Sequence, residues 1–130
     1  LLFMTLDIFR EYCLAKPGVT EDYPFDGECA WLKVAGKMFA LVNVTEMKMG
    51  DEAIPPFHFA NLKCDPERAI ELREEYEAIE PGWHMSKKHW NTIYFDGGLK
   101  DSFIKELIDH AYELVFSGLP KKTQEALKKG

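Results

Sequence analysis

The sequence predicts an α+β fold of the order α-β(3)-α-β(2)-α, with a mainly antiparallel sheet and helices on one face. Apolar residues recur at helical spacing near both ends of the chain, and alternating strand patterns lie between them. The strand patterns follow one another closely, without crossover segments, which favours antiparallel pairing. At 130 residues and 46% hydrophobic, residues 1–130 are expected to form a single domain with a real core.

The first half of the chain predicts a helix followed by strands. Thr5 can cap a helix that runs to about Ala15. An acidic loop is expected over residues 21–27. Strands are then predicted at 28–34, 37–44 and 57–64, with a loop of polar residues and methionines at 45–56.

A two-residue turn, Ala35-Gly36, joins the first two of these strands and suggests their register. In that register Leu32 faces Phe39 and Trp31 faces Ala40. Side chains alternate along a strand, so the register assigns each position to a face. One face would carry Ala30, Leu32, Val34, Phe39 and Leu41. The other would carry Trp31, Lys33, Met38, Ala40 and Val42.

The second half begins with a strong helix start, Asp65-Pro66, and this helix is expected to reach about Tyr76. Two further short strands are predicted within residues 77–95. A long amphipathic helix follows from about Lys100 to Phe116, and a short tail helix closes the chain.

Composition limits the classes of partner and compartment. The net charge is −6, from 22 acidic and 16 basic residues, so any nucleic-acid footprint must be a local basic patch. The three cysteines are odd in number and widely spaced, which favours reduced thiols in the cytoplasm over a disulfide framework or a zinc site. The apolar start is too short for a signal peptide, and no membrane association is expected. Residues 1–4 are expected to be frayed or extraneous, with Met4 a candidate initiator.

The strongest candidate site is the run from Pro81 to Thr92, which crowds indoles, imidazoles and lysines between a turn and a strand. One interpretation is a wing that sets lysines on phosphates while an indole stacks on a base. The other is a tight corner whose indoles close the edge of the core while the lysines remain solvated. The predicted nucleic-acid-binding residues are Trp83, His84, Lys87, Lys88, His89, Trp90, Asn91 and Lys63.

A second candidate surface is the sheet face without helices. Its expected members are Trp31, Lys33, Met38, Phe59, Asn61, Lys63, Trp90, Thr92 and Tyr94. Aromatic residues among lysines on a sheet suit bases or a docked peptide, and a homodimer interface would equally cover such a face.

Catalytic and metal chemistry have little support. His84 and His89 are five apart, with no cysteine or carboxylate at ligand spacing, so no metal is expected. Cys64 precedes a helix cap, yet its alternation places it toward the core, where a thiol is inert. No nucleophile motif or phosphate loop is present, so we expect no catalytic residue, no cofactor and no enzymatic activity.

Several blocks of the chain together resemble the MmcQ/YjbR family of small bacterial proteins. The blocks are Pro17-Gly18-Val19-Thr20-Glu21, Gly36-Lys37-Met38-Phe39-Ala40, Asn61-Leu62-Lys63-Cys64-Asp65-Pro66, the run from Pro81 to Thr92, and the stretch from Leu107 to Lys122. The resemblance covers about residues 5–125. It implies a frataxin-like or secretion-chaperone-like α+β fold and a "double wing" DNA-binding role, and it carries over no catalytic residue. The 45–56 loop departs from the family pattern, being longer and richer in methionine.

Overall fold

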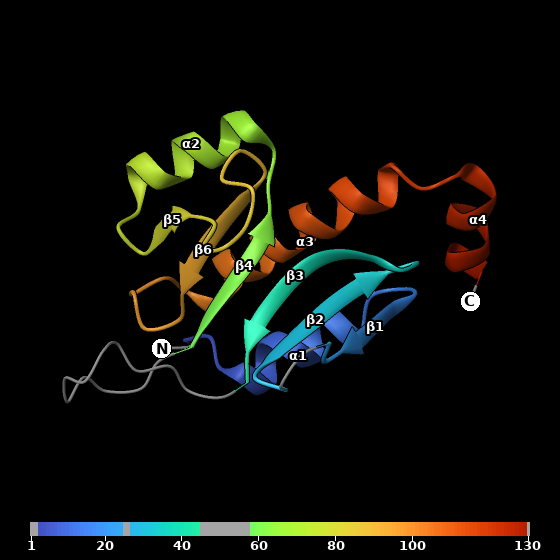
Figure 1. Cartoon of the computed structure of the whole chain (residues 1–130), viewed down its shortest axis with the longest axis horizontal. Coiled ribbons are helices and arrows are strands. Elements are labelled where there is room, and N and C mark those ends of the chain that lie inside the picture. Colours follow the sequence, from blue (N-terminus) through green and yellow to red (C-terminus); the bar gives the residue numbers. More distant parts are fainter. Residues whose placement is uncertain (1–2, 25–26, 45–57, 130) are drawn as a thin grey trace.

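The structure is a computed structural model that describes residues 3–24, 27–44 and 58–129. Within these residues, six strands form one antiparallel sheet in the order β1-β2-β3-β4-β6-β5 (Figure 1). The strands are β1 (Val19–Asp22), β2 (Cys29–Val34), β3 (Lys37–Asn43), β4 (Phe59–Lys63), β5 (Ile79–Pro81) and β6 (Trp90–Tyr94). The helices are α1 (Leu6–Leu14), α2 (Pro66–Glu75), α3 (Asp101–Ser117) and α4 (Lys121–Lys129). The predicted α+β class with a mainly antiparallel sheet is confirmed. The expected loop at 45–56 lies outside the described residues.

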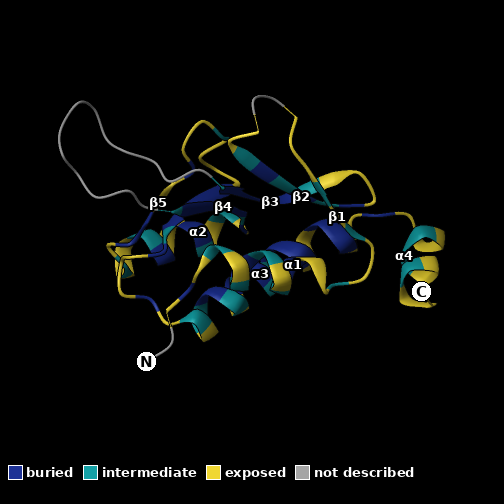
Figure 2. Ribbon diagram, turned by 90° about the horizontal axis from the view of Figure 1, so that it is seen from below, coloured by how far each residue is buried: buried dark blue, intermediate teal, exposed yellow. Residues whose placement is uncertain are grey.

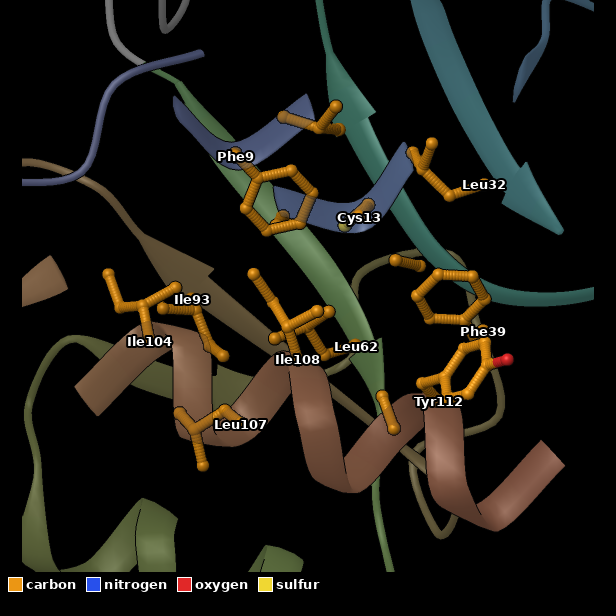
Figure 3. Close-up of a cluster of buried hydrophobic side chains, with 14 of the residues drawn as sticks. Phe9, Cys13, Leu32, Phe39, Leu62, Ile93, Ile104, Leu107, Ile108 and Tyr112 are labelled. Carbon is orange, nitrogen blue, oxygen red and sulfur yellow. The ribbon is translucent and has the colours of Figure 1, made fainter. Parts of the chain in front are cut away.

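Helices α1, α2 and α3 pack on one face of the sheet, as the sequence predicts (Figure 2). Phe9 and Cys13 of α1 and the apolar stripe of α3 meet the inward residues of β2, β3, β4 and β6 in one core (Figure 3). Leu32, Phe39, Leu62 and Ile93 are all buried there. Burial of such side chains is the main favourable term in the stability of the fold.

The acidic stretch after α1 is the first departure from the prediction. Residues 19–22 form the edge strand β1, which pairs with β2 from Val19↔Val34 to Asp22↔Trp31. A loop was expected at 21–27, because Glu21 and Asp22 are poor strand formers. Charged residues are common on edge strands, where they oppose pairing with another chain.

A β-bulge in β3 is the second departure. Lys33 pairs with Met38 as predicted, but Leu32 pairs with Ala40 and Trp31 with Leu41. Phe39 is therefore an extra residue in β3. Beyond it the predicted faces are exchanged, because one inserted residue shifts alternation by one step. Ala40 and Val42 pair with inward residues, whereas Leu41 lies opposite Trp31 on the face away from the helices.

The two ends of the described chain are tied to the body. Phe3 forms a β-bridge with Lys100, and Met4 is buried in the core, so the frayed start that was expected for residues 1–4 does not extend to these two. Helix α4 lies apart from the main helices (Figure 1) and returns to the body through Leu127, whose side chain lies against Gly18.

Candidate nucleic-acid interface

Residues 82–89, here called the wing loop, connect β5 to β6 and lie on the sheet face away from the helices (Figure 2). The loop begins at Gly82, whose backbone N–H donates to the carbonyl of Trp90 at 2.9 Å. A Cβ on Gly82 would lie 2.6 Å from Cβ of Trp90, so only glycine fits this approach. The loop is thereby drawn tightly against the start of β6.

Three hydrogen bonds fix the N-terminal end of the wing loop, at Trp83, to the sheet. The Trp83 N–H donates to Thr92 Oγ1 at 2.8 Å, and the Thr92 hydroxyl donates to Asn61 Oδ1 at 2.6 Å. Asn61 Nδ2 donates back to the Trp83 carbonyl at 2.9 Å. Asn61 and Thr92 are buried, so these bonds satisfy side chains that would otherwise be costly in the sheet.

Arg73 of α2 fixes the C-terminal end of the wing loop. Its guanidinium donates to the carbonyl of Lys87, to the carbonyl of Trp90 at 3.3 Å, and to Asn91 Oδ1 at 2.7 Å. Asn91 Nδ2 donates to the Ala69 carbonyl at 3.3 Å. The Asn91 side chain is therefore buried on the helix side of the sheet, where it helps to hold the loop and does not join its exposed surface.

The two tryptophans of the predicted site have opposite environments. Trp83 is 48% exposed, and its ring meets Phe59 edge-on at 5.5 Å and His84 at 4.1 Å. Trp90 is only 7% exposed, with Lys63 Nζ 5.8 Å from its ring centroid. Trp83 is thus the indole that a ligand can reach, and Trp90 anchors the strand.

The lysines and histidines of the wing loop are exposed with Trp83. His84, Lys87, Lys88 and His89 are all exposed, and Lys63 is half-buried at the end of β4. Lys87 Nζ donates to the Gly82 carbonyl at 3.1 Å, so this lysine also supports the loop. Trp83, His84, Lys87, Lys88 and His89 are thus exposed together on one loop, whereas Lys63 lies beside the Trp90 ring. Trp90 and Asn91 are buried and do not join this exposed surface.

Next to the wing loop is a pocket of about 260 Å³ on the same sheet face, here called the wing pocket. Its apolar lining includes Trp31, Leu41, Phe59, Trp83 and Met85. Its polar lining includes Glu28, Cys29, Asn61 and His84. The prediction missed Leu41 as a member of this face because nothing in the β2–β3 alternation reveals the bulge at Phe39.

A wider hollow of about 770 Å³ lies near the start of the chain, lined by Phe3, Asp7, His58 and Asp96 among others. Its described lining holds carboxylates but no lysine or arginine, so it does not suit a polyanion. Across residues 3–24, 27–44 and 58–129, no three His, Cys, Asp or Glu side chains cluster as metal ligands. Over the same residues, no helix has the length and apolar character needed to span a membrane.

The YjbR family model matches residues 14–114. The chain belongs to the YjbR family. It is 33% identical to the uncharacterized protein YjbR of Escherichia coli K12, over 95% of this chain and 98% of that protein. It is also 32% identical to the uncharacterized protein YyaQ of Bacillus subtilis, over 83% of this chain and 94% of that protein.

Solved structures of similar proteins have the same fold. A crystal structure of the Deinococcus radiodurans protein DR2400, with a domain named DUF419, superposes with a TM-score of 0.81 at 34% identity, over 97% of this chain and 89% of that one. A Pseudomonas syringae protein superposes with a TM-score of 0.72 at 27% identity, over 85% of this chain and 98% of that one. These two proteins thus share the fold of this chain.

Proposed function

We propose that this YjbR protein is a non-enzymatic nucleic-acid-binding protein that uses the wing loop and Lys63. The proposal rests mainly on the environment of Trp83. Its indole is half-exposed, and the backbone of its loop is held by hydrogen bonds at both ends. A large aromatic side chain held in water suits stacking on a base. The exposed Lys87 and Lys88 beside it suit phosphate oxygens.

The net charge of −6 makes this interaction local and weak. The net negative charge opposes the approach of a polyanion, and the basic residues of the wing loop must offset it locally, so binding should depend strongly on ionic strength. We infer a cytoplasmic location, which is supported by three cysteines that form no disulfide.

The test is a salt titration of binding to a fluorescently labelled random single-stranded oligodeoxynucleotide, followed by anisotropy. The logarithm of affinity should fall linearly with the logarithm of salt concentration. Lys63→Glu/Lys88→Glu should weaken binding and flatten the slope by about 1.4, at about 0.7 per lost phosphate contact on a single strand. Lys87 is left unchanged because its ammonium group holds the Gly82 carbonyl.

The matched control is Lys121→Glu/Lys122→Glu, which makes the same charge change at the exposed start of α4. This control variant should keep most of the affinity for the oligonucleotide and most of the slope of its salt dependence. An equal effect of the two double variants would mean that net charge, and not the wing loop, governs binding.

The second candidate function is a protein- or peptide-interaction module on the same sheet face, or a homodimer interface there. The apolar lining of the wing pocket and the acidic body favour it. Absence of oligonucleotide binding at low salt would contradict the first proposal and leave this one, which does not require phosphate contacts.

A further inference from the structure

We propose that the wing pocket receives one unpaired base of a single-stranded nucleic acid. The inference rests on the proposed function and adds a ligand group and a position for it. The wing loop would hold the phosphates, and the base would turn inward from the strand onto the sheet face.

The size of the pocket suits a single ring system. Pockets that hold drug-sized ligands measure about 300–1,000 Å³. The wing pocket, at about 260 Å³, falls just below that range. It therefore accommodates one flat heterocycle or one side chain, but not a dinucleotide cofactor.

The walls of the pocket suit a flat aromatic group. Trp31, Phe59 and Trp83 line it together with Leu41, so aromatic faces and edges surround the space. Aromatic side chains stack on any base, because every base has a π-face. The exposed Glu28 carboxylate is also part of the lining, and a carboxylate accepts a hydrogen bond from the amino group of cytosine.

The position of the pocket links it to the basic residues. Trp83 and His84 belong both to the wing loop and to the pocket lining, and Lys87 and Lys88 follow in the same loop. A strand whose phosphates contact these lysines would therefore have a base within reach of the pocket. A paired base is held in its stack and must first be extruded, so the pocket favours single strands over duplex.

The first experiment uses the unmodified protein and two probes. One is an octamer of deoxycytidine, and the other is an abasic octamer with the same number of phosphates. The octamer that carries bases should bind at least about fivefold more tightly, which is the lower end of base–aromatic stacking. Equal affinities for both probes overturn the pocket proposal while the polyanion binding stands. No salt-dependent binding of either probe overturns both proposals.

The second experiment removes a pocket wall. Trp31→Ala should reduce the preference for the deoxycytidine octamer, with Trp83 still in the lining, and leave binding of the abasic octamer unchanged. The control is Tyr94→Ala, which deletes an aromatic side chain on the same sheet face but outside the pocket lining. A preference that is unchanged in Trp31→Ala, or reduced equally in Tyr94→Ala, overturns the proposal.

A third measurement needs no variant and so does not depend on how Trp31→Ala folds. Cys29 lines the pocket and is half-buried, whereas Cys13 and Cys64 are buried. Saturating deoxycytidine octamer should slow alkylation of Cys29 severalfold, and heparin, a polyanion without bases, should not. Equal protection by both probes, or by neither, overturns the proposal.

Discussion

Trp83, in the wing loop, and Trp90, the first residue of β6, should respond differently when their side chains are removed. Trp90→Ala removes a buried indole and should lower the free energy of unfolding by about 3–5 kcal/mol. Trp83→Ala removes an exposed indole and should instead lower the free energy of oligonucleotide binding by about 1–3 kcal/mol. Urea denaturation and anisotropy measure the two quantities.

The opposite pattern would assign the wing loop to structure alone. If Trp83→Ala unfolds as readily as Trp90→Ala and binds as well as the original protein, the exposed indole has no part in recognition.

His110 is a second residue whose environment makes a prediction. Its Nε2 accepts the backbone N–H of Asp65 at 3.1 Å, so the ring must be neutral there. Burial, and next the Arg68 guanidinium, lower the pKa of His110 below its ordinary 6.5, against an opposing effect of Asp65. Below pH 6.5 the unfolded chain binds a proton that the folded chain resists, so stability falls as the pH falls through this window.

His110→Gln offers an amide oxygen as acceptor for the Asp65 N–H but does not titrate. Its free energy of unfolding should therefore change less between about pH 6.5 and pH 5 than that of the original protein. Urea denaturation across that range measures the difference. Parallel pH profiles would show that His110 does not contribute to the acid sensitivity.

At the scale of elements, glycines at positive φ test how α4 is held. Gly18 has φ +76°, and a Cβ there would lie 2.4 Å from Leu127 Cδ2. Gly36 has φ +79° and no heavy atom within 4 Å of such a Cβ. Gly36→Ala should therefore cost only the backbone term, about 1–2 kcal/mol.

Gly18→Ala adds the displacement of Leu127 to that same backbone term. It should destabilise the fold somewhat more than Gly36→Ala and speed amide hydrogen exchange in α4. Exchange in α4 that is unchanged by Gly18→Ala would mean that Leu127 does not hold this helix.

The elements also show where sequence reasoning succeeds. The helices and five of the six strands follow from apolar periodicity and turn residues, because burial of one face imposes that pattern. Strand β1 does not show this apolar pattern, since an edge strand does not require alternating apolar residues. The bulge at Phe39 cannot be read from the apolar pattern either, because the straight and the bulged register both place apolar residues on both faces of β3.

At the scale of the whole molecule, thiol reactivity reports global opening. Burial raises the pKa of the Cys13 and Cys64 thiols, so both should react only when the fold opens. A thiol reagent should modify Cys29 first in the native protein and all three cysteines in denaturant. Fewer than three groups in fresh denatured protein would indicate a disulfide and contradict a reducing compartment.

The candidate site could be predicted only in part. A run of indoles and lysines is visible in the sequence, and Trp83, Lys87 and Lys88 are indeed exposed on one loop. The residues that position the loop were not assigned that role, since Asn61 and Arg73 are distant in sequence and their partners become known only from the pairing of β4 with β6 and the packing of α2.

The hydrogen bonds that join the wing loop to Asn61, Thr92 and Arg73 should also affect the rates of binding and release. A loop that is already ordered does not lose the backbone conformational entropy that a flexible loop loses on association. The remaining entropic cost is then the ordering of the lysine side chains, at about 0.5–1.5 kcal/mol each. The association rate should then follow long-range charge and hence ionic strength, whereas the residence time should follow the contact made by the indole. The lysines would therefore set mainly the association rate, and Trp83 mainly the dissociation rate.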